Sequence, residues 1–531
     1  MLKRSTITLA CAVAALFGAA ACNDEAFLTE VPYDFVGPEN FYRTTDDAQA
    51  ALAGVYATAV ASSGDNYYGR NFVMLSEFLT EMQTPYLSAT NERSLVDNYT
   101  FTPAHSYLYS TWQSAYQAIN RANSVIDRVP GIAMDTTVRS RIVGEAKFLR
   151  ALHYFNLVRL FGGVPLRTTE TVALDSLQQP RATAPQVYAQ IVADLRDAIR
   201  VLPSRYTGPD IGRATRGAAK TLLAKAYLQR AGTGVTARVG VDSALTLLRD
   251  VKANEGYTLV ANYASLFDMT NEVNSEVVFD IQCSRSNGVG CRLSNQVAPR
   301  LSNYGSGQNG SFTAEEPFYE EFVAADRRRT ATWQLSFTNK AGATVSYLAT
   351  NNTANGAYGA DTPYMAKFLD RQSVSSGNDE PNYIVLRYAD NLLMEAEAIN
   401  ELSGPTADAY AAVNAVRTRA GLPNLVAGLS TGAFRDSVFH ERRLELAMEG
   451  PNGYFDSQRN WPWAKARIEA NLAQGVRWLT LPAAQRVRQS RWPKFANGTT
   501  AAPVLTDKFR LMPIPTQARD LNPLLEQNPG W

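Results

Sequence analysis

The chain has 531 residues, 45% of them hydrophobic, and its 51 basic residues nearly balance 50 acidic ones. This is the composition of a globular protein, and the length would allow two to four domains. Because no basic face or tail stands out, the charge disfavours polyanionic partners, and we expect no nucleic acid to bind.

Residues 1–21 have the features of a secretory signal that ends at a cysteine. Lys3 and Arg4 precede an uncharged apolar stretch, and Ala19-Ala20-Ala21 leads directly into Cys22. The stretch is shorter than the ~20 apolar residues of a membrane-spanning helix, and polar residues follow at once. We expect this segment to be removed and the Cys22 thiol to be acylated, so that lipid alone holds the protein on a membrane. Plain secretion with a chance cysteine is the alternative.

Two further cysteines, Cys283 and Cys291, lie eight residues apart in the mature sequence. Outside the cytoplasm a disulfide between them is plausible, and two free thiols are the alternative. Zinc is not expected, because neither a CxxC pair nor a neighbouring histidine is present.

Helical periodicity dominates the middle and the end of the sequence. Glycine and proline pairs such as Pro130-Gly131 and Gly162-Gly163 stop individual helices. The predicted helices span 111–129, 138–161, 185–202, 217–229, 242–253, 383–402, 407–420 and 433–449. They come mostly in pairs and resemble tetratricopeptide repeats, although their spacing is irregular. We therefore expect a mainly α fold, a scaffold of stacked helix hairpins.

Two long stretches, 67–109 and 283–377, lack this periodicity and are rich in Asn, Ser, Thr, Gly and Tyr. Loops with short strands fit this composition best. Long irregular segments on a rigid frame are where binding residues are usually found.

Five blocks of sequence together resemble the SusD/RagB family of outer-membrane lipoproteins. The blocks are GEAKFLRALHYFNLVRLFGGVPL at 144–166, RATRGAAKTLLAKAYLQ at 213–229, NYIVLRYADNLLMEAEAIN at 382–400, VNAVRTRAGLP and ERRLELAMEGPNGYFDSQR within 413–459, and MPIPTQARDLNPLLEQNPGW at 512–531. Their order and their spread over nearly the whole chain carry the resemblance. One departure is Pro451-Asn452-Gly453-Tyr454, where the family commonly has a basic and an aromatic residue.

The resemblance implies a SusD-like fold over the mature chain 22–531, with halves of about 22–235 and 270–531 in one compact unit. It also implies nutrient binding on behalf of a partner SusC-like, TonB-dependent transporter in the outer membrane. Asp24 and Glu25, soon after the anchor, resemble the family's surface-export signals, so the body is expected to face the cell exterior.

By position, glycan-binding members of the family use residues before the first predicted helix and from loops in the middle of the chain. Tyr86 and Asn91 fall in the first region, and Tyr304 and Phe312 in the second. Trp333 is a further candidate, although the arginines before it indicate an exposed turn. Aromatic rings fit the C–H face of a sugar, and amides bond its hydroxyl groups, but peptide cargo remains an alternative.

No pattern of catalysis, metal binding or cofactor binding is present, and the family binds its ligand without cleaving it. HExxH, GxSxG and Walker sequences are lacking, and the three histidines, His105, His153 and His440, are expected to be core or surface residues. Buried arginine and carboxylate pairs, such as one formed by Asp390, are expected to be architectural. A cargo-free scaffold and an unrecognised glycoside hydrolase, whose carboxylates leave no short motif, are the alternatives from other classes.

Overall fold

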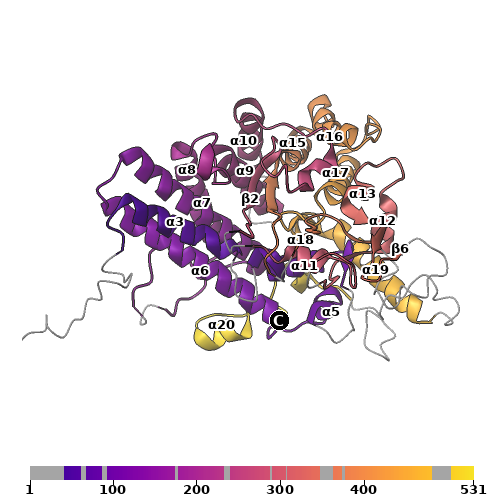
Figure 1. Ribbon diagram of the computed structural model, residues 1–531, viewed down its shortest axis with the longest axis horizontal. Coiled ribbons are helices and arrows are strands. Elements are labelled where there is room, and N and C mark those ends of the chain that lie inside the picture. The colour runs from indigo at the N-terminus through magenta and orange to yellow at the C-terminus, as the bar shows by residue number, and fades with distance from the viewer. Residues whose placement is uncertain are drawn as a thin grey trace, which may run out of the picture.

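The computed structural model describes most of the chain (Figure 1). The described residues are 41–60, 67–85, 92–173, 177–232, 240–286, 290–305, 308–346, 363–373, 377–480 and 504–531. Residues 1–40, with the predicted signal segment and Cys22, lie outside them, as do Tyr86 and Asn91. Within the described ranges, no helix has the length and apolar character needed to cross a membrane.

The first half of the molecule is a stack of helices in which each helix packs on the next (Figure 1). Its members are α3 (Thr45–Val60), α6 (Ser106–Arg128), α7 (Thr136–Phe161), α8 (Ala184–Val201), α9 (Arg216–Gly232) and α10 (Val241–Asn254). Local sequence fixes the ends of α7: the Asp135 carboxylate accepts from the backbone N–H groups of Thr137 and Val138, and Gly162 adopts φ +72° just after the last turn. The predicted helical hairpins are confirmed here, whereas α3 was not predicted.

The second half continues the stack through α15 (Tyr388–Ser403), which packs against α10. It is followed by α16 (Ala407–Arg419), α17 (Thr431–Leu446), α18 (Asn452–Arg459) and α19 (Trp461–Thr480). The prediction of helix over 383–387 is wrong, because these residues form strand β8 (Tyr383–Arg387), antiparallel to β2 (Val277–Ile281). Both strands are buried, and such a short apolar run has no period that separates strand from helix.

Short strands and short helices fill the stretches that lacked periodicity. One sheet has the order β1-β3-β7-β4, and β5 pairs with β6. The strands are β1 (Gln83–Thr84), β3 (Thr313–Ala314), β4 (Trp333–Gln334), β5 (Ser336–Thr338), β6 (Thr344–Ser346) and β7 (Tyr364–Met365). The short α-helices are α4 (Phe72–Glu77), α5 (Glu92–Asp97), α11 (Leu293–Val297), α12 (Glu316–Glu321), α13 (Arg329–Thr332) and α20 (Thr516–Leu521). A π-helix, η1 (Tyr67–Asn71), and the 3-10 helices η2 (Val129–Gly131), η4 (Gly208–Asp210), η5 (Tyr263–Phe267) and η7 (Asp507–Arg510) complete the set.

The largest hydrophobic cluster takes side chains from α3 to α20 and therefore includes both halves of the sequence. A second cluster lies between α15, α16 and α17. The C-terminus closes the first cluster, because the Trp531 indole packs against Phe101 and Phe509 and donates to the carbonyl oxygen of Leu511 at 3.0 Å. Trp531 is therefore a packing residue.

Candidate functional site

The two irregular regions that carried the predicted ligand contacts meet at the small sheet. Strand β1 pairs with β3, so that Gln83 faces Ala314 and Thr84 faces Thr313. Arg93 adds a side-chain contact between the regions by donating to the Ser311 hydroxyl. Sequence positions more than 200 residues apart therefore form one sheet.

Tyr304 packs beside this sheet, against Tyr364 of β7. Its ring packs with Phe337, Val345 and Tyr364 in a small satellite cluster and is 9% exposed. The Arg371 guanidinium covers the ring at 4.9 Å from its centroid, and Arg371 itself is exposed. An aromatic ring beneath an exposed, planar donor has both an apolar face and hydrogen-bonding capacity.

Phe312 and Trp333 do not fit their predicted role as ligand contacts. Phe312 is fully buried and stacks on Phe78 with ring centroids 4.9 Å apart. Trp333 is 1% exposed and lies edge-to-face against Phe318 and Phe322. Rings without an exposed face have no contact to offer a ligand, and we assign both to the hydrophobic core.

The exposed turn expected before Trp333 is present at Arg327, which lies in a turn and is exposed, but the prediction fails for Arg328. Arg328 is fully buried, and its guanidinium donates to Asp326 and to Glu441, the latter at 2.6 Å. Arginine is usually exposed, so the sequence alone predicted that Arg328 would be exposed. Its burial depends on carboxylates that are distant in the sequence and supply its partners.

Cys283 and Cys291 form a disulfide, with their Cα atoms 5.4 Å apart. Both cysteines are buried, and Cys283 N–H donates to the Asn382 side chain at 2.8 Å. The bond closes a short loop next to the end of β2, so it ties this irregular segment to the strand pair.

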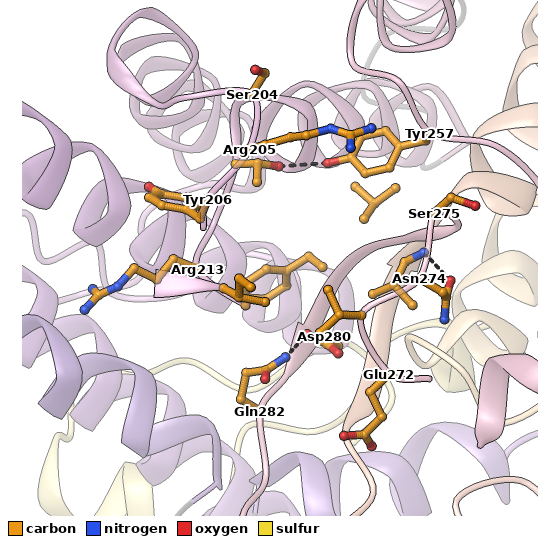
Figure 2. A pocket seen from close by; sticks show the side chains of 17 residues that line it. Ser204, Arg205, Tyr206, Arg213, Tyr257, Glu272, Asn274, Ser275, Asp280 and Gln282 are labelled. Atoms are coloured by element: carbon orange, nitrogen blue, oxygen red, sulfur yellow. Dashed lines mark hydrogen bonds between the residues drawn. The ribbon is translucent and has the colours of Figure 1, made fainter. Parts of the chain in front are cut away.

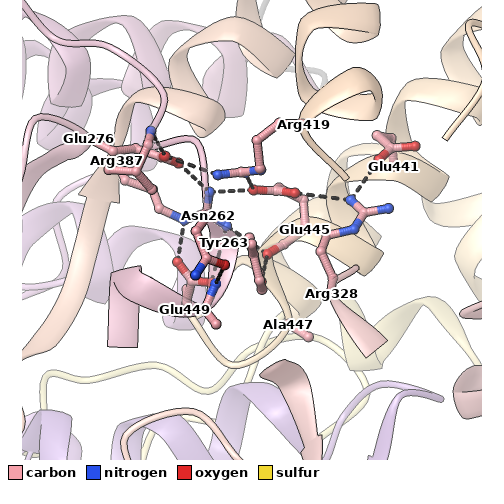
Figure 3. A network of polar contacts seen from close by, with 12 residues as sticks. Asn262, Tyr263, Glu276, Arg328, Arg387, Arg419, Glu441, Glu445, Ala447 and Glu449 are labelled. Atoms are coloured by element: carbon pink, nitrogen blue, oxygen red, sulfur yellow. Dashed lines mark hydrogen bonds and ion pairs between the residues drawn. The ribbon is translucent and has the colours of Figure 1, made fainter. Parts of the chain in front are cut away.

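The most extensive set of buried charges lies around β8, α16 and α17 (Figure 3). Its members are Arg328, Arg387, Arg419, Glu276, Glu441, Glu445 and Glu449. Glu445 lies at the centre: one oxygen accepts from Arg387 at 2.5 Å and also from Arg419, and the other accepts from Arg328 at 3.0 Å. Burial by itself would raise the pKa of Glu445, but the three guanidinium groups outweigh it and hold that pKa well below its usual range.

This network joins helices and strands instead of lining a cavity, so we interpret it as architectural, as the sequence predicted. A second buried set agrees with this interpretation: Asp390 pairs with Arg442 at 2.8 Å and with Lys225 at 2.6 Å. Burial would raise the pKa of Asp390, but these two cations hold it well below its usual value.

The three histidines lie in different parts of the fold. His153 is fully buried, neither ring nitrogen has a partner among the described residues, and burial lowers its pKa to about 3. The His105 ring accepts from the Tyr107 N–H at the start of α6, and its other nitrogen lies 2.9 Å from the Glu92 carbonyl oxygen. His440 lies 3.3 Å from Glu321 on the outer side of α17. Each histidine is a core or surface residue, as predicted.

A cavity of about 310 Å³ is present at a place that no sequence motif indicated (Figure 2). Its wall combines the connection between α8 and α9, at 204–215, with Tyr257 and the segment 272–282 that includes β2. The lining residues come from two loops and a strand, so no periodicity in the sequence could have brought them together.

The comparisons with known proteins agree with this fold over nearly its full length. The model of the SusD family matches residues 246–531, and a second model, starch-binding associating with outer membrane, matches 33–228. SusD-like protein P2 of Formosa agariphila is 27% identical over 477 residues, covering 85% of this chain and 90% of that protein. A SusD homolog from Bacteroides thetaiotaomicron has a TM-score of 0.77 at 25% identity, covering 93% of this chain and 98% of that one. A laminarin-binding SusD-like protein has a TM-score of 0.70 at 26% identity, covering 92% and 100%. The chain belongs to the SusD family.

Proposed function

We propose that this protein binds oligosaccharides or polysaccharides at the outer face of the outer membrane and passes them to a transporter. The observation that carries the proposal is the likeness to a laminarin-binding SusD-like protein over 92% of this chain. The starch-binding model that matches the first half supports the same class of ligand. Because one fold can host different ligands, the residues of the site, and not the fold, determine which glycan is bound.

We place the glycan on the surface around Tyr304 and Arg371. Arg371, which lies over this ring, is exposed, and so is Asn303, the residue before Tyr304 in the chain. Hydroxyl groups of a sugar would accept from the Arg371 guanidinium, and a C–H face would contact the tyrosine only where Arg371 leaves its ring uncovered. Tyr86 and Asn91 are further proposed contacts from the segment that follows β1.

The anchor and the partner complete the proposal. Lipid on Cys22 would hold the folded body near a SusC-like TonB-dependent transporter, which raises the effective concentration of each for the other. Cys22→Ala should abolish incorporation of labelled palmitate and release the protein from outer-membrane fractions. A pull-down with the lipidated protein should recover a TonB-dependent transporter, and its repeated failure would contradict delivery while leaving glycan binding untouched.

Affinity electrophoresis of the purified full-length lipoprotein through gels that contain different polysaccharides tests the binding itself. We expect at least one glycan, with laminarin as the first choice, to retard migration. Tyr86→Ala and Tyr304→Ala should each weaken retardation by about tenfold in affinity, equivalent to ~1.4 kcal/mol. Tyr410→Ala is the matched control, since Tyr410 lies on α16 and packs against Phe434.

If peptides bind the protein and no glycan retards its migration, the result would support peptide cargo and refute the glycan proposal. We propose no catalytic step, because the described site has aromatic and cationic groups in place of a pair of carboxylates. Release of sugar products from a bound glycan by the purified protein would contradict this part of the proposal.

A further inference from the structure

The cavity of Figure 2 is built from elements other than those of the proposed glycan surface. It lies where the connection after α8 approaches the start of β2, and thus between the two halves of the sequence. Its volume, about 310 Å³, is at the lower end of the range for small-molecule sites. Two apolar side chains at its rim, Ile211 and Val273, are 42% and 69% exposed, so the cavity opens to solvent past them.

Two carboxylates, Glu272 and Asp280, line the cavity without a cation. Among the residues that the structure describes, neither forms an ion pair. Their partners are neutral amides: the backbone N–H of Asn382 donates to Glu272 at 2.6 Å, and the Asn382 side chain donates to Asp280 at 3.0 Å. The Gln282 side chain donates to the other oxygen of Asp280. Each carboxylate accepts up to about four hydrogen bonds, so acceptor capacity is left over.

The arginines that border the cavity have other partners. Arg213 points away from it (Figure 2) and pairs with Asp210 at 2.7 Å and with Glu145 at 3.4 Å. Arg205 is exposed and donates to the carbonyl oxygen of Gly256 at 3.0 Å. Among the described residues, neither arginine pairs with Glu272 or Asp280, whose hydrogen-bond partners are dipoles.

Ionising Glu272 and Asp280 in this lining costs free energy, and a bound cation would reduce that cost. Burial raises the pKa of Glu272 to about 7, with further increase from Asp280 and Glu380 nearby. Burial also raises the pKa of Asp280 to about 6. Both directions show that the ionised carboxylates lack a compensating positive charge.

The remaining walls favour an organic cation over a bare metal ion. Tyr206 and Tyr257 both line the cavity, and Val277 adds an apolar side chain. Two carboxylates are too few for a hard cation such as Ca²⁺, which takes six to eight oxygen ligands. Among the described residues, no group of three or more His, Cys, Asp or Glu side chains is arranged to hold a metal ion.

We propose that this cavity binds a small organic molecule through a primary ammonium group, which lies against Glu272 and Asp280 while the carbon body packs against Tyr206 and Tyr257. An amino sugar and a simple alkyl amine share this chemistry and are the two sources considered. The site is separate from the glycan surface, so a failure of this proposal would leave the proposed glycan binding untouched, and the reverse is also true.

Isothermal titration of the full-length lipoprotein with three probes tests the proposal. Glucosamine and n-butylamine should bind, while glucose, which has the size and hydroxyl groups of glucosamine but no charge, should bind at least tenfold more weakly. Binding of glucosamine without n-butylamine would assign the site to amino sugars, and binding of both would assign it to the ammonium group alone. Equal binding of glucose and glucosamine, binding of no amine, or displacement of glucosamine by millimolar Ca²⁺ would overturn the proposal.

Two variants tie the binding to the cavity. Asp280→Asn keeps the shape of the side chain and removes its charge, and it should weaken glucosamine binding at least tenfold. Val273→Trp changes an exposed rim residue, so it leaves folding intact while obstructing the opening, and it should also reduce binding. Asp408→Asn, a 75% exposed carboxylate on α16, is the control and should change nothing. Unchanged amine binding in both cavity variants would refute the assignment.

Discussion

Replacing Glu445 by Gln separates an architectural charge network from a functional one. Glu445 is fully buried and accepts hydrogen bonds from three guanidinium groups, those of Arg387, Arg419 and Arg328. Glutamine keeps the size of the side chain but removes the charge that these arginines share. Each arginine retains another carboxylate, so the loss should lie near the lower end of the ~3–5 kcal/mol typical of a broken buried pair. We therefore expect the free energy of unfolding to fall by about 3 kcal/mol.

Urea unfolding measures this loss, and Glu401→Gln is the matched control. Glu401 pairs with Arg435 at 2.6 Å, but the two side chains are 23% and 34% exposed. A pair of this kind contributes ~0–1 kcal/mol, so the control should barely shift the unfolding midpoint. Equal losses in the two variants, or a loss below ~1 kcal/mol in Glu445→Gln, would refute the role assigned to the network.

Acid adds a second readout for Glu445. Because its pKa is depressed in the folded state, its contribution is present above the unfolded value of 4.5 and is lost as the pH falls below that value. The difference in stability between Glu445→Gln and the native protein should therefore shrink on acidification. Glycan retardation by the folded variant should match the native protein, because no residue of the network is among the proposed ligand contacts.

Three further predictions concern stability. Burial raises the pKa of Glu77 to about 8, so the folded state retains a proton that the unfolded chain loses near pH 4.5. The free energy of unfolding of the native protein, measured with urea, should therefore fall by several kcal/mol between pH 5 and pH 8, at ~1.4 kcal/mol per pKa unit. The free energy of unfolding of Glu77→Gln should fall much less over the same range. Cys291→Ser should lower the free energy of unfolding by about 2–3 kcal/mol under oxidising conditions, and dithiothreitol should then have no further effect. Gly163→Ala would place a Cβ 2.4 Å from the Ala182 carbonyl oxygen and should cost ~1–3 kcal/mol, whereas Gly131→Ala meets no atom within 4 Å and should be nearly neutral in the same assay.

Helices with an apolar stripe and clear stop signals were predictable to within a few residues. The prediction of 138–161, for example, corresponds to α7 at Thr136–Phe161. By contrast, α3 was missed, because its alanine-rich sequence gives only a weak contrast between its faces. The run at 383–387 was misassigned, because its identity as a strand depends on β2, more than 100 residues earlier.

The residues of the candidate site could be predicted from the sequence only where local sequence determines whether a side chain is exposed. Tyr304 and Phe312 lie in similar polar surroundings in the sequence, yet Phe312 is buried by Phe78 from a distant helix. The cavity with Glu272 and Asp280 could not be inferred, because packing of separate loops creates it and carboxylates are common in any sequence. Pairing of Cys283 with Cys291 was a plausible inference, since so short a separation limits the choices.

The central claim, that the protein binds a glycan without cleaving it, is tested most directly by titrating the purified protein with laminarin and the other polysaccharides of the panel. Heat of binding and the appearance of reducing ends should be followed in the same samples. We predict saturable binding to at least one polysaccharide, weakened by Tyr304→Ala, with no new reducing ends after prolonged incubation. Absence of binding to every polysaccharide, or binding accompanied by the steady release of reducing sugar, would contradict the account.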